Sequence, residues 1–476
     1  MRRFLPFALF GAVLSCSDAT TATAPPVEPV ATYVYAHSFG GATLGERISA
    51  AIAALPETGG VVDATDFAGA QRIDQTVALG SATKPVELRL GNVTISASVV
   101  PFELHDDAKL IGNDLTLVTQ DSGANLEWLV TGTGLSNCEI AHLTIDGNRA
   151  ANTQPGSGIG LHTAARCWVH HVVVRNTVGN FHPGIAFFDD GNSDNTIEYN
   201  RVENIGTLTD YADGIYVAGP GNKILFNRIR NATDFGIVGE TCAGCVIEGN
   251  DISGTPAGIA IGSGIAGFTS PGNVVASNTI TGGSTTTWGI ISVYRTGGSS
   301  LVSTVVQGNV VRNVANGHGI FVSDADQVSL NGNVLTSIAP SAESYGIFVK
   351  DSRNVSIVGG TIDSTGGYGI GIARSANVAV DGVVITDTGR SSYYWAGIAL
   401  DALAGNSTSI SLTNLHIFDR DPVIDTKRMS YCIDLAQGGT NSGIVVGGNL
   451  YDDGVNATGC RNGNLHIGNA LRVTTY

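Results

Sequence analysis

Two aspartates occupy comparable places in a recurring phrase of this chain, and a pair of carboxyl groups can carry out acid–base chemistry. Asp213 and Asp234 each lie just before a Gly-Ile dipeptide, one repeat apart. Two carboxyls held within roughly 5–9 Å can cleave a glycosidic bond. Their mutual repulsion raises one pKa, so one group acts as the acid and the other as the base. We predict that Asp234 protonates the leaving oxygen and that Asp213 activates water.

The two aspartates also have a purely structural interpretation, because Asp side chains often accept hydrogen bonds from the backbone of turns. The residue types around them nevertheless favour sugar binding. Aromatic faces bind sugar rings, and a few convergent polar groups set the orientation of the ring. The predicted substrate-binding residues, all near the same phrase, are Tyr211, His182, Glu240, Trp288, Arg295 and His318.

The Gly-Ile phrase indicates the architecture that positions these residues. It recurs at a spacing of 22 to 31 residues, and Val, Ile and Thr dominate the runs between the turn residues. A repeat of this length built from short β-prone runs is typical of a solenoid. The phrase begins at Gly158, Gly184, Gly214, Gly236, Gly258, Gly289, Gly319, Gly346, Gly369 and Gly397. Three short strands per repeat resemble an all-β, right-handed parallel β-helix, and the chain length allows about 12 coils.

A second ladder has the same period and supports the stacking of the coils. Its asparagines each lie two residues before an aliphatic residue. Asn tolerates the left-handed backbone of a sharp turn, and stacked amides hydrogen-bond from coil to coil. The ladder consists of Asn200, Asn227, Asn250, Asn278, Asn309 and Asn333.

The charge balance limits the partners of the chain. Charged residues make up only 14% of its 476 residues, yet the net charge is −16. Nucleic-acid binding needs clustered Lys and Arg, so we expect no nucleic-acid partner. We assign no resident cofactor and no metal centre, and we assign no role to His170-His171. The acidic loop from Phe187 to Asp194 offers oxygen ligands to Ca²⁺ but lacks the spacing of a known Ca²⁺ loop.

The N-terminus reads as an export signal. Arg2 and Arg3 precede an apolar segment that is too short for an ordinary membrane span. The stretch that ends at Cys16 resembles a bacterial lipoprotein lipobox, which implies a signal peptide over 1–15 and an acylated Cys16. The alternative is a plain signal peptide cut a few residues later. Residues 16–32 then form a flexible tether, and we predict a lipid-anchored protein at the bacterial cell envelope.

Six further cysteines form three pairs. Cys138 and Cys167 are 29 residues apart, and Cys432 and Cys460 are 28 apart, which is about one coil. Stacked strands lie within disulfide reach, so we predict that each of these pairs is bridged. Cys242 and Cys245 form a lone CxxC, for which a structural bridge is favoured over a redox or metal site.

The segment before the repeats carries a family resemblance. Residues 46–55 have helical spacing and are followed by Pro56 and Gly59-Gly60. A helix, a Gly-Gly turn and a first strand in this order resemble the N-terminal cap of pectate-lyase-superfamily β-helix proteins. The resemblance implies a cap and first coils over 33–110, a β-helix over 111–450, and a last coil with a C-terminal cap over 451–476.

The surroundings of the two aspartates resemble family 28 polygalacturonase-type glycosidases. Asp213 matches the first Asp of that family's site, and Asp234 matches the leading residue of its Asp-Asp pair. Phe235 stands where the second Asp would be, Ala257 replaces a His, and no Arg-x-Lys motif follows. The resemblance implies a glycosidase, but it does not carry over galacturonate as the sugar.

Three functions remain open at this point. The first is a lipid-anchored enzyme that hydrolyses a polysaccharide through the carboxylate pair. The second is a non-catalytic glycan-binding or adhesive surface protein. The third is a uronate lyase or epimerase, for which Arg295, Lys350 and Arg374 offer charges that neutralise a uronate. We expect the chain to be a monomer or, as some relatives are, a homotrimer.

Overall fold

Two sheets of parallel strands form nearly all of the structure. The computed structural model describes residues 32–81, 83–207, 211–263, 269–295, 302–339, 344–391, 395–400, 406–418, 429, 431–435, 441–448, 465–466 and 471–475. The chain divides into Met1–Ala31 and Thr32–Tyr476. The predicted signal peptide and Cys16 lie in the first unit, outside the described residues, so their role stays a prediction.

The smaller sheet, here called sheet B, carries the candidate site. Its 15 strands pair in parallel in chain order. They are β4 (Val77–Leu79), β7 (Phe102–Leu104), β9 (Val130–Thr133), β11 (Ile159–His162), β14 (Ile185–Phe188), β17 (Ile215–Ala218), β20 (Phe235–Glu240), β23 (Ala257–Ser263), β26 (Ser284–Arg295), β29 (Asn316–Ser323), β32 (Ile347–Lys350), β35 (Ile370–Ala373), β38 (Ala396–Leu400), β41 (Tyr431–Asp434) and β43 (Leu465–His466).

The larger sheet, sheet A, contains two columns of strands per coil. The first column is β1 (Tyr33–Tyr35), β2 (Gly60–Ala64), β5 (Val86–Leu90), β8 (Lys109–Gln120), β10 (Glu139–Asp146), β12 (Trp168–His170), β15 (Thr196–Glu198), β18 (Lys223–Leu225), β21 (Val246–Glu248), β24 (Val274–Ala276), β27 (Val302–Gln307), β30 (Asp326–Asn331), β33 (Arg353–Val358), β36 (Ala376–Asp381), β39 (Thr408–Thr413), β42 (Ser442–Gly447) and β44 (Leu471–Thr475).

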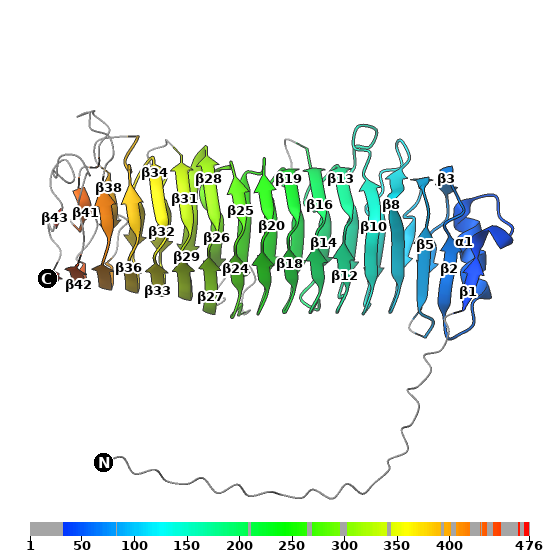
Figure 1. The fold of residues 1–476 in the computed structure, drawn as a ribbon, viewed down its shortest axis with the longest axis horizontal. Coiled ribbons are helices and arrows are strands. Elements are labelled where there is room, and N and C mark those ends of the chain that lie inside the picture. Colours follow the sequence, from blue (N-terminus) through cyan, green and yellow to red (C-terminus); the bar gives the residue numbers. More distant parts are fainter. Residues whose placement is uncertain are drawn as a thin grey trace, which may run out of the picture. The chain divides into compact units, whose positions relative to one another are not determined.

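The second column of sheet A follows one bend later in each coil, and β8 and β10 run through both columns. Its other strands are β3 (Gly69–Ile73), β6 (Val93–Ala97), β13 (Val173–Thr177), β16 (Arg201–Ile205), β19 (Arg228–Ala232), β22 (Asp251–Ser253), β25 (Thr279–Thr281), β28 (Val310–Val314), β31 (Val334–Ile338), β34 (Thr361–Thr365), β37 (Val384–Thr386) and β40 (His416–Phe418). The two columns of sheet A and the strands of sheet B together make a parallel β-solenoid of about 13 turns, whereas about 12 were predicted from the sequence (Figure 1).

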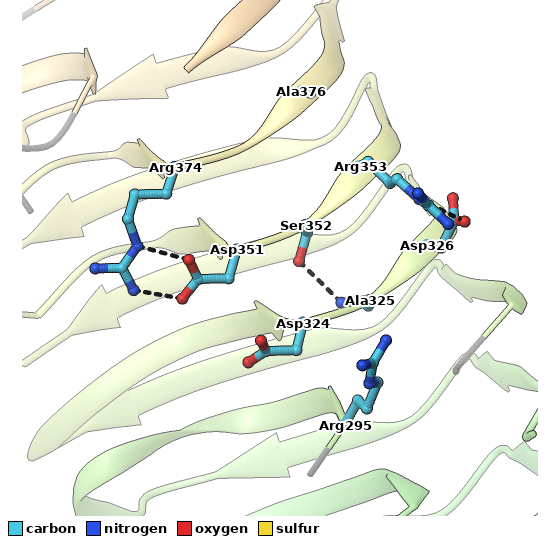
Figure 2. Close-up of a pocket in the computed structure, with 9 residues that line it drawn as sticks. All are labelled: Arg295, Asp324, Ala325, Asp326, Asp351, Ser352, Arg353, Arg374 and Ala376. Carbon is cyan, nitrogen blue, oxygen red and sulfur yellow. Dashed lines mark hydrogen bonds and ion pairs between the residues drawn. The ribbon is translucent and has the colours of Figure 1, made fainter. Parts of the chain in front are cut away.

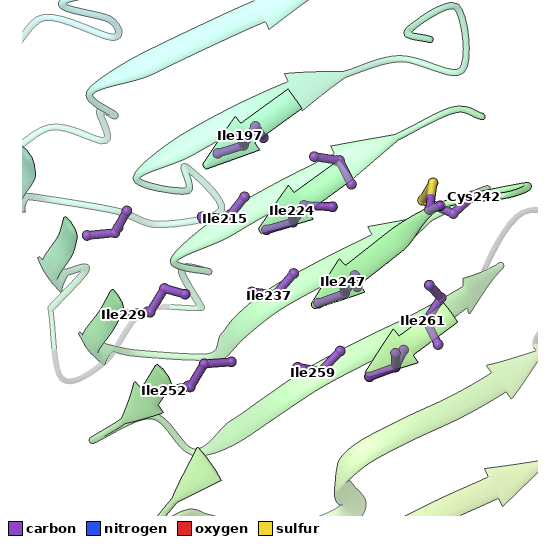
Figure 3. Close-up of a cluster of buried hydrophobic side chains, with 14 of the residues drawn as sticks. Ile197, Ile215, Ile224, Ile229, Ile237, Cys242, Ile247, Ile252, Ile259 and Ile261 are labelled. Atoms are coloured by element: carbon purple, nitrogen blue, oxygen red, sulfur yellow. A yellow bond between two sulfur atoms is a disulfide. The ribbon is translucent and has the colours of Figure 1, made fainter. Parts of the chain in front are cut away.

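The core of the solenoid is a set of stacked aliphatic ladders. Ile159, Ile185, Ile215, Ile237 and Ile259 pair in direct register from coil to coil, and all are fully buried. Figure 3 shows Ile215, Ile237 and Ile259 of this ladder together with isoleucines of sheet A. Since strand residues alternate between the two faces, the residue that follows each Ile points outward.

The glycine before each Ile is required by close packing. A Cβ atom at Gly214 would lie 2.6 Å from both the Gly236 carbonyl oxygen and Ile229 Cγ2. A side chain at this position would therefore push the sheets apart. The predicted phrase shifts by one residue in a single coil, because Ile291 and not Ile290 pairs with Ile259. The register of β26 also shifts between Ser284 and Gly289, where five residue steps of β26 oppose two of β29.

The asparagine ladder is confirmed as a chain of buried hydrogen bonds. Asn250 Nδ2 donates to Asn278 Oδ1 over 2.9 Å and to the Ile224 carbonyl over 2.9 Å. The same contact joins every pair from Asn200 to Asn333. The expectation that these asparagines adopt left-handed backbone is wrong. That conformation belongs to the residue before each of them, such as Tyr199 at φ 54° and Gly308 at φ 60°.

A helix covers the first coil, as predicted. α1 spans Leu44–Ala54 and begins with a capping box, in which the Thr43 hydroxyl accepts from the Glu46 N–H and the Glu46 side chain accepts from Thr43 N–H. A short 3₁₀ helix, η1 (Ala36–Ser38), precedes it. Leu44 and Ile48 on the buried face of α1 join the core. The helix thus closes the apolar end of the solenoid.

Two of the three predicted disulfides are present. Cys138 pairs with Cys167 on the next coil, and Cys242 pairs with Cys245 within one turn. Cys432 is buried and disulfide-bonded. Cys460 lies outside the described residues, so its pairing with Cys432 stays a prediction. Within the described part of the chain, no helix has the length and apolar character needed to cross a membrane.

Candidate active site

The coil register brings Asp213 and Asp234 together at the start of adjacent strands of sheet B. Ile215 of β17 pairs with Ile237 of β20, so Asp234 stands one residue out of phase with Asp213, as expected. The Phe235 N–H donates to Asp213 Oδ1 over 3.1 Å, and the Asp234 N–H donates to the Ala212 carbonyl over 3.1 Å. These bonds hold the turns that carry both carboxyls side by side.

Three more polar side chains on the outer face of sheet B complete an acid cluster with the two aspartates. They are Tyr216, Glu240 and Tyr294. The Tyr216 hydroxyl donates to Glu240 Oε2 over 2.7 Å. Glu240 and Tyr294 lie in the same register slot, separated by Gly262 on the strand between them. We define the acid cluster as Asp213, Tyr216, Asp234, Glu240 and Tyr294.

Sequence reasoning identified the three carboxyls of this cluster and missed both tyrosines. Tyr216 follows its Gly-Ile phrase, and alternation along the strand places it on the outer face, so the same pattern could have found it. Gly262 is needed between Glu240 and Tyr294, because a Cβ atom there would lie 2.0 Å from the Tyr294 carbonyl oxygen.

The electrostatics of the cluster favour protonated groups. Burial, the charge of Asp234 and that of Glu240 raise the pKa of Asp213 well above its ordinary value, and the Phe235 N–H bond offsets only part of this. Burial raises the pKa of Asp234 to about 6. Since desolvation disfavours the charged form, both carboxyls hold their protons to higher pH than ordinary aspartates do.

The two tyrosines are held as phenols. Burial and the hydrogen bond to Glu240 raise the pKa of Tyr216 above its ordinary value. Burial and the charges of Glu240, Asp213 and Asp234 raise the pKa of Tyr294. Both hydroxyls therefore remain hydrogen-bond donors over the whole range in which the carboxyls titrate. The arrangement offers proton donors, a carboxylate base and phenol donors on one solvent-facing strand surface.

The comparisons identify the family. The chain matches the family described as "Right handed beta helix region" over residues 122–280, 184–342 and 288–469. These ranges cover most of the sequence. The chain belongs to the right-handed β-helix family. No curated protein matches it in sequence.

Solved structures similar to this β-helix protein share its fold at low sequence identity. A tailspike protein of E. coli bacteriophage HK620 in complex with a pentasaccharide is 12% identical, with a TM-score of 0.55 over 91% of this chain and 77% of that chain. The mannuronan C-5 epimerase AlgE6 A-module of Azotobacter vinelandii is 15% identical, with a TM-score of 0.43 over 93% and 98%. The catalytic unit of a GH87 α-1,3-glucanase from Streptomyces thermodiastaticus is 17% identical, with a TM-score of 0.43 over 91% and 72%. At these identities the comparisons show the fold alone.

Aromatic rings line the outer face of the β-helix on the N-terminal side of the acid cluster. The Phe188 ring lies 5.4 Å from Tyr216 and 5.5 Å from Trp128, measured between ring centroids. His182 is half-buried against Trp128, at 5.3 Å. Its Nε2 lies 3.6 Å from Glu127 Oε1. His182 thus belongs to this ring surface.

Two exposed rings stand next to Asp213. Tyr211 and Phe181 are 63% and 71% exposed, with ring centroids 5.9 Å apart. The Phe181 N–H donates to the Tyr211 carbonyl over 2.7 Å, which ties the two turns together. Tyr211 therefore lies beside the acid cluster on a surface open to a ligand.

His318, another predicted binding residue, lies away from the cluster. His318 packs among Phe321, Tyr345 and Phe348 on β29 and the next coil, where burial lowers its pKa to about 4. It accepts the Tyr345 N–H at Nδ1. Trp288 is part of β26, but its side chain lies outside the described part of the structure. The structure therefore does not bring His318 to the carboxyls.

A polar cavity of about 400 Å³ lies at the C-terminal ends of the sheet B strands and contains Arg295, which follows Tyr294 of the acid cluster along β26 (Figure 2). Arg374 pairs with Asp351, and Lys350 Nζ lies 4.0 Å from the same carboxylate, so two of the three predicted uronate-neutralising cations share one protein carboxylate. Among the described residues, Arg295 makes no ion pair. The other residues that line the cavity belong to later coils.

The acidic loop that was considered for Ca²⁺ directs two of its carboxylates to protein partners. Asp190 Oδ1 accepts from the Thr241 hydroxyl over 2.7 Å, and Asp189 Oδ2 lies 3.0 Å from His162 Nδ1. The interpretation of this segment as an ordinary solvated loop, without a calcium site, stays a prediction.

Proposed function

We propose that this β-helix protein is a carbohydrate-active enzyme that hydrolyses a polysaccharide at the acid cluster. The observation that carries the proposal is the clustering of three carboxyls on adjacent coils, two of them with raised pKa values that have different causes. Titratable groups with pKa values pushed apart by their environment are what general acid–base catalysis requires.

The causes of the pKa shifts favour exchanging the roles assigned from the sequence. Burial and two neighbouring carboxylates raise the pKa of Asp213, whereas burial alone raises that of Asp234, so in the proposal Asp213 carries the proton and donates it to the leaving glycosidic oxygen. Asp234, with a pKa of about 6, is mostly ionised at neutral pH and accepts the proton of the attacking water. In this reaction the bond from the anomeric carbon to the leaving oxygen breaks, and a bond from that carbon to the water oxygen forms.

The rings beside the cluster supply binding surface for a sugar chain. Tyr211 and Phe181 lie on one side of Asp213, and Phe188 with Trp128 continues the surface over earlier coils. Ring faces bind sugar rings, while phenol and carboxyl groups orient hydroxyls. Tyr216 and Tyr294 act as such orienting groups in the proposal.

The lyase and epimerase alternative receives less support from this site. Removing a proton from a uronate needs a base and a cation that stabilises the carboxylate of the substrate. Both phenols of the cluster have raised pKa values, and no Lys or Arg charge contributes to the shifts of the two aspartates. The bond from Phe235 N–H to Asp213 instead favours a second candidate, a glycan-binding protein whose carboxyl stabilises a turn.

A panel of neutral and acidic polysaccharides tests the proposal. Hydrolysis releases new reducing ends without an unsaturated product that absorbs in the ultraviolet, whereas a lyase yields that product. We expect D213N and D234N each to lower the rate by about 10²–10⁴-fold. The exposed D74N variant is the matched control. Full activity in both site variants would contradict the assignment, and binding without turnover would favour the glycan-binding alternative.

We further propose that the protein is exported and lipid-anchored through Cys16 at the bacterial cell envelope. The support is the N-terminal sequence pattern alone. Metabolic labelling with a fatty acid, compared between the native chain and C16S, tests this. Equal labelling of both chains would contradict it.

A further inference from the structure

Three histidines gather on sheet A, on a different face from the acid cluster. Ala141 of β10 pairs with His170 of β12, so His142 and His171 follow at equivalent places on adjacent coils. Their backbones share a left-handed bend, with φ of 59° and 52°. The possible ligand nitrogens of His142, His170 and His171 all lie within 4.8 Å of one another.

Carboxylates orient the rings of two of the three histidines. His142 Nδ1 lies 2.9 Å from Asp114 Oδ1, and His170 Nε2 lies 3.2 Å from Glu139 Oε1. These contacts fix both rings, and the nitrogens that do not contact a carboxylate are His142 Nε2 and His170 Nδ1. Metal-binding histidines are commonly oriented in this way, by a carboxylate on the ring nitrogen that does not touch the metal.

The third histidine directs a nitrogen at the same point. His171 Nδ1 lies 3.0 Å from His170 Nδ1. Lys109 Nζ lies 2.9 Å from Glu139 Oε2, so the carboxylate behind His170 is itself held in place. His170 is buried, His142 is half-buried and His171 is exposed. The cluster therefore has ordered supporting groups on its inner side and opens to solvent on the other.

Ring stacking alone does not account for the convergence of these nitrogens. The rings of His142, His171, Tyr199 and Phe226 stack down one column at centroid distances of 5.0, 5.5 and 5.3 Å. Tyr199 and Phe226 fill this column without any ring nitrogen. His170 lies outside the column and stacks on Trp168 instead, at 3.7 Å.

We propose that His142, His170 and His171 form a binding site for a divalent transition-metal ion such as Zn²⁺, with a solvent molecule completing the coordination. Three imidazoles suit Zn²⁺, Ni²⁺ or Cu²⁺, whereas Ca²⁺ and Mg²⁺ prefer oxygen ligands. The ion would join the two coils that the Cys138–Cys167 disulfide also connects. The proposal does not depend on the enzymatic function.

Titration of the tag-free, metal-stripped full chain with ZnCl₂ in a calorimeter tests the site. We expect one equivalent of Zn²⁺ to bind and to raise the thermal midpoint. In H171F the ring of the column remains but its nitrogens are gone, and Phe226 shows that Phe fits this bend at φ 54°. This variant should lose more than about tenfold in Zn²⁺ affinity while keeping the metal-free thermal midpoint.

Two further variants complete the test. H142F should weaken Zn²⁺ binding in the same way, and H171Q tests the loss of the ligand if the aromatic replacement disturbs folding. H416F is the matched control, because His416 stacks on Phe418 far from the cluster. Absence of stoichiometric Zn²⁺ binding to the native chain, or equal affinity in the native chain and the folded H171F and H142F variants, would overturn the proposal.

Discussion

At the scale of single residues, the acid cluster depends on which face each side chain occupies. Asp213, Asp234 and Glu240 could be predicted because the repeat phrase assigns them to neighbouring coils. Tyr294 could not, because the aligned residue of its coil is Ile291 and not Ile290. A shift of one residue exchanges the two faces of a strand, so the phrase at Gly289-Ile290 would have placed Tyr294 inside the core.

The buried carboxyl of Asp213 should make the stability of the protein fall as the pH rises. Its pKa in the folded state is raised, so the folded chain retains a proton that the unfolded chain has released. Between the ordinary pKa and the raised one, rising pH therefore favours unfolding. We expect D213N to raise the thermal midpoint at pH 7 by about 1–3 °C, with the difference disappearing near pH 4.

Thermal melts of the native chain, D213N and the exposed control D74N at the two pH values check this prediction. The control should match the native chain at both. If the D213N midpoint exceeded the native midpoint equally at pH 4 and pH 7, the pKa of Asp213 would not be raised in the folded protein, and the prediction would be contradicted.

At the scale of elements, two neighbouring residues of each bend between strands have different roles. One makes the hydrogen bonds between coils, and the other adopts the left-handed backbone. The sequence predicted the asparagine ladder because a regular period is visible in one chain. The assignment of the left-handed backbone to those asparagines was wrong, because the residue that bonds the coils and the residue that adopts positive φ are neighbours and not the same residue. Asn278 bonds the adjacent coils, while Ser277 before it takes φ 55°.

Ser277 and Gly308 occupy the same bend in successive coils and form a matched pair. Both are exposed, with φ of 55° and 60°. A Cβ atom at Gly308 would meet nothing closer than Ser277 Oγ at 3.9 Å, so packing does not interfere. Left-handed backbone costs a non-glycine residue about 1 kcal/mol. We expect S277G to stabilise and G308A to destabilise by about this amount.

Chemical denaturation of the two variants and of the double variant measures these effects. The two changes should offset each other, leaving the double variant near the native free energy of unfolding. If S277G were destabilising, the side chain of Ser277 rather than its backbone would govern this bend.

At the scale of the whole molecule, each coil packs only against its neighbours. Strand contacts connect elements one coil apart, such as β19 with β22 and β22 with β25. The sequence predicted this architecture, its capping helix and two disulfides from periodicity and pairing. The outer face that carries the site was harder to predict, because its residues follow no repeat and each contributes its own chemistry.

Because each coil packs only against its neighbours, a substitution in one coil should destabilise that coil and the adjacent ones. Asn250 is buried, and its amide bonds to Asn227, Asn278 and the Ile224 carbonyl. We expect N250A to leave buried groups unpaired and to increase amide hydrogen exchange by more than about tenfold in β19, β22 and β25. The first coils, β2 and β5, should exchange at the native rate. The half-exposed N331A is the control, and uniform loss of protection along the chain would contradict this local account.

The central claim is that coil stacking couples Asp213 and Asp234 into one acid–base unit. Carbon-13 NMR titration of the side-chain carboxyls, in the native chain and in D234N, measures this coupling without knowledge of the substrate. We predict that Asp234 titrates near pH 6, that Asp213 titrates well above its ordinary range, and that D234N lowers the midpoint of Asp213. Ordinary midpoints for both aspartates, or an Asp213 midpoint unchanged in D234N, would contradict the account.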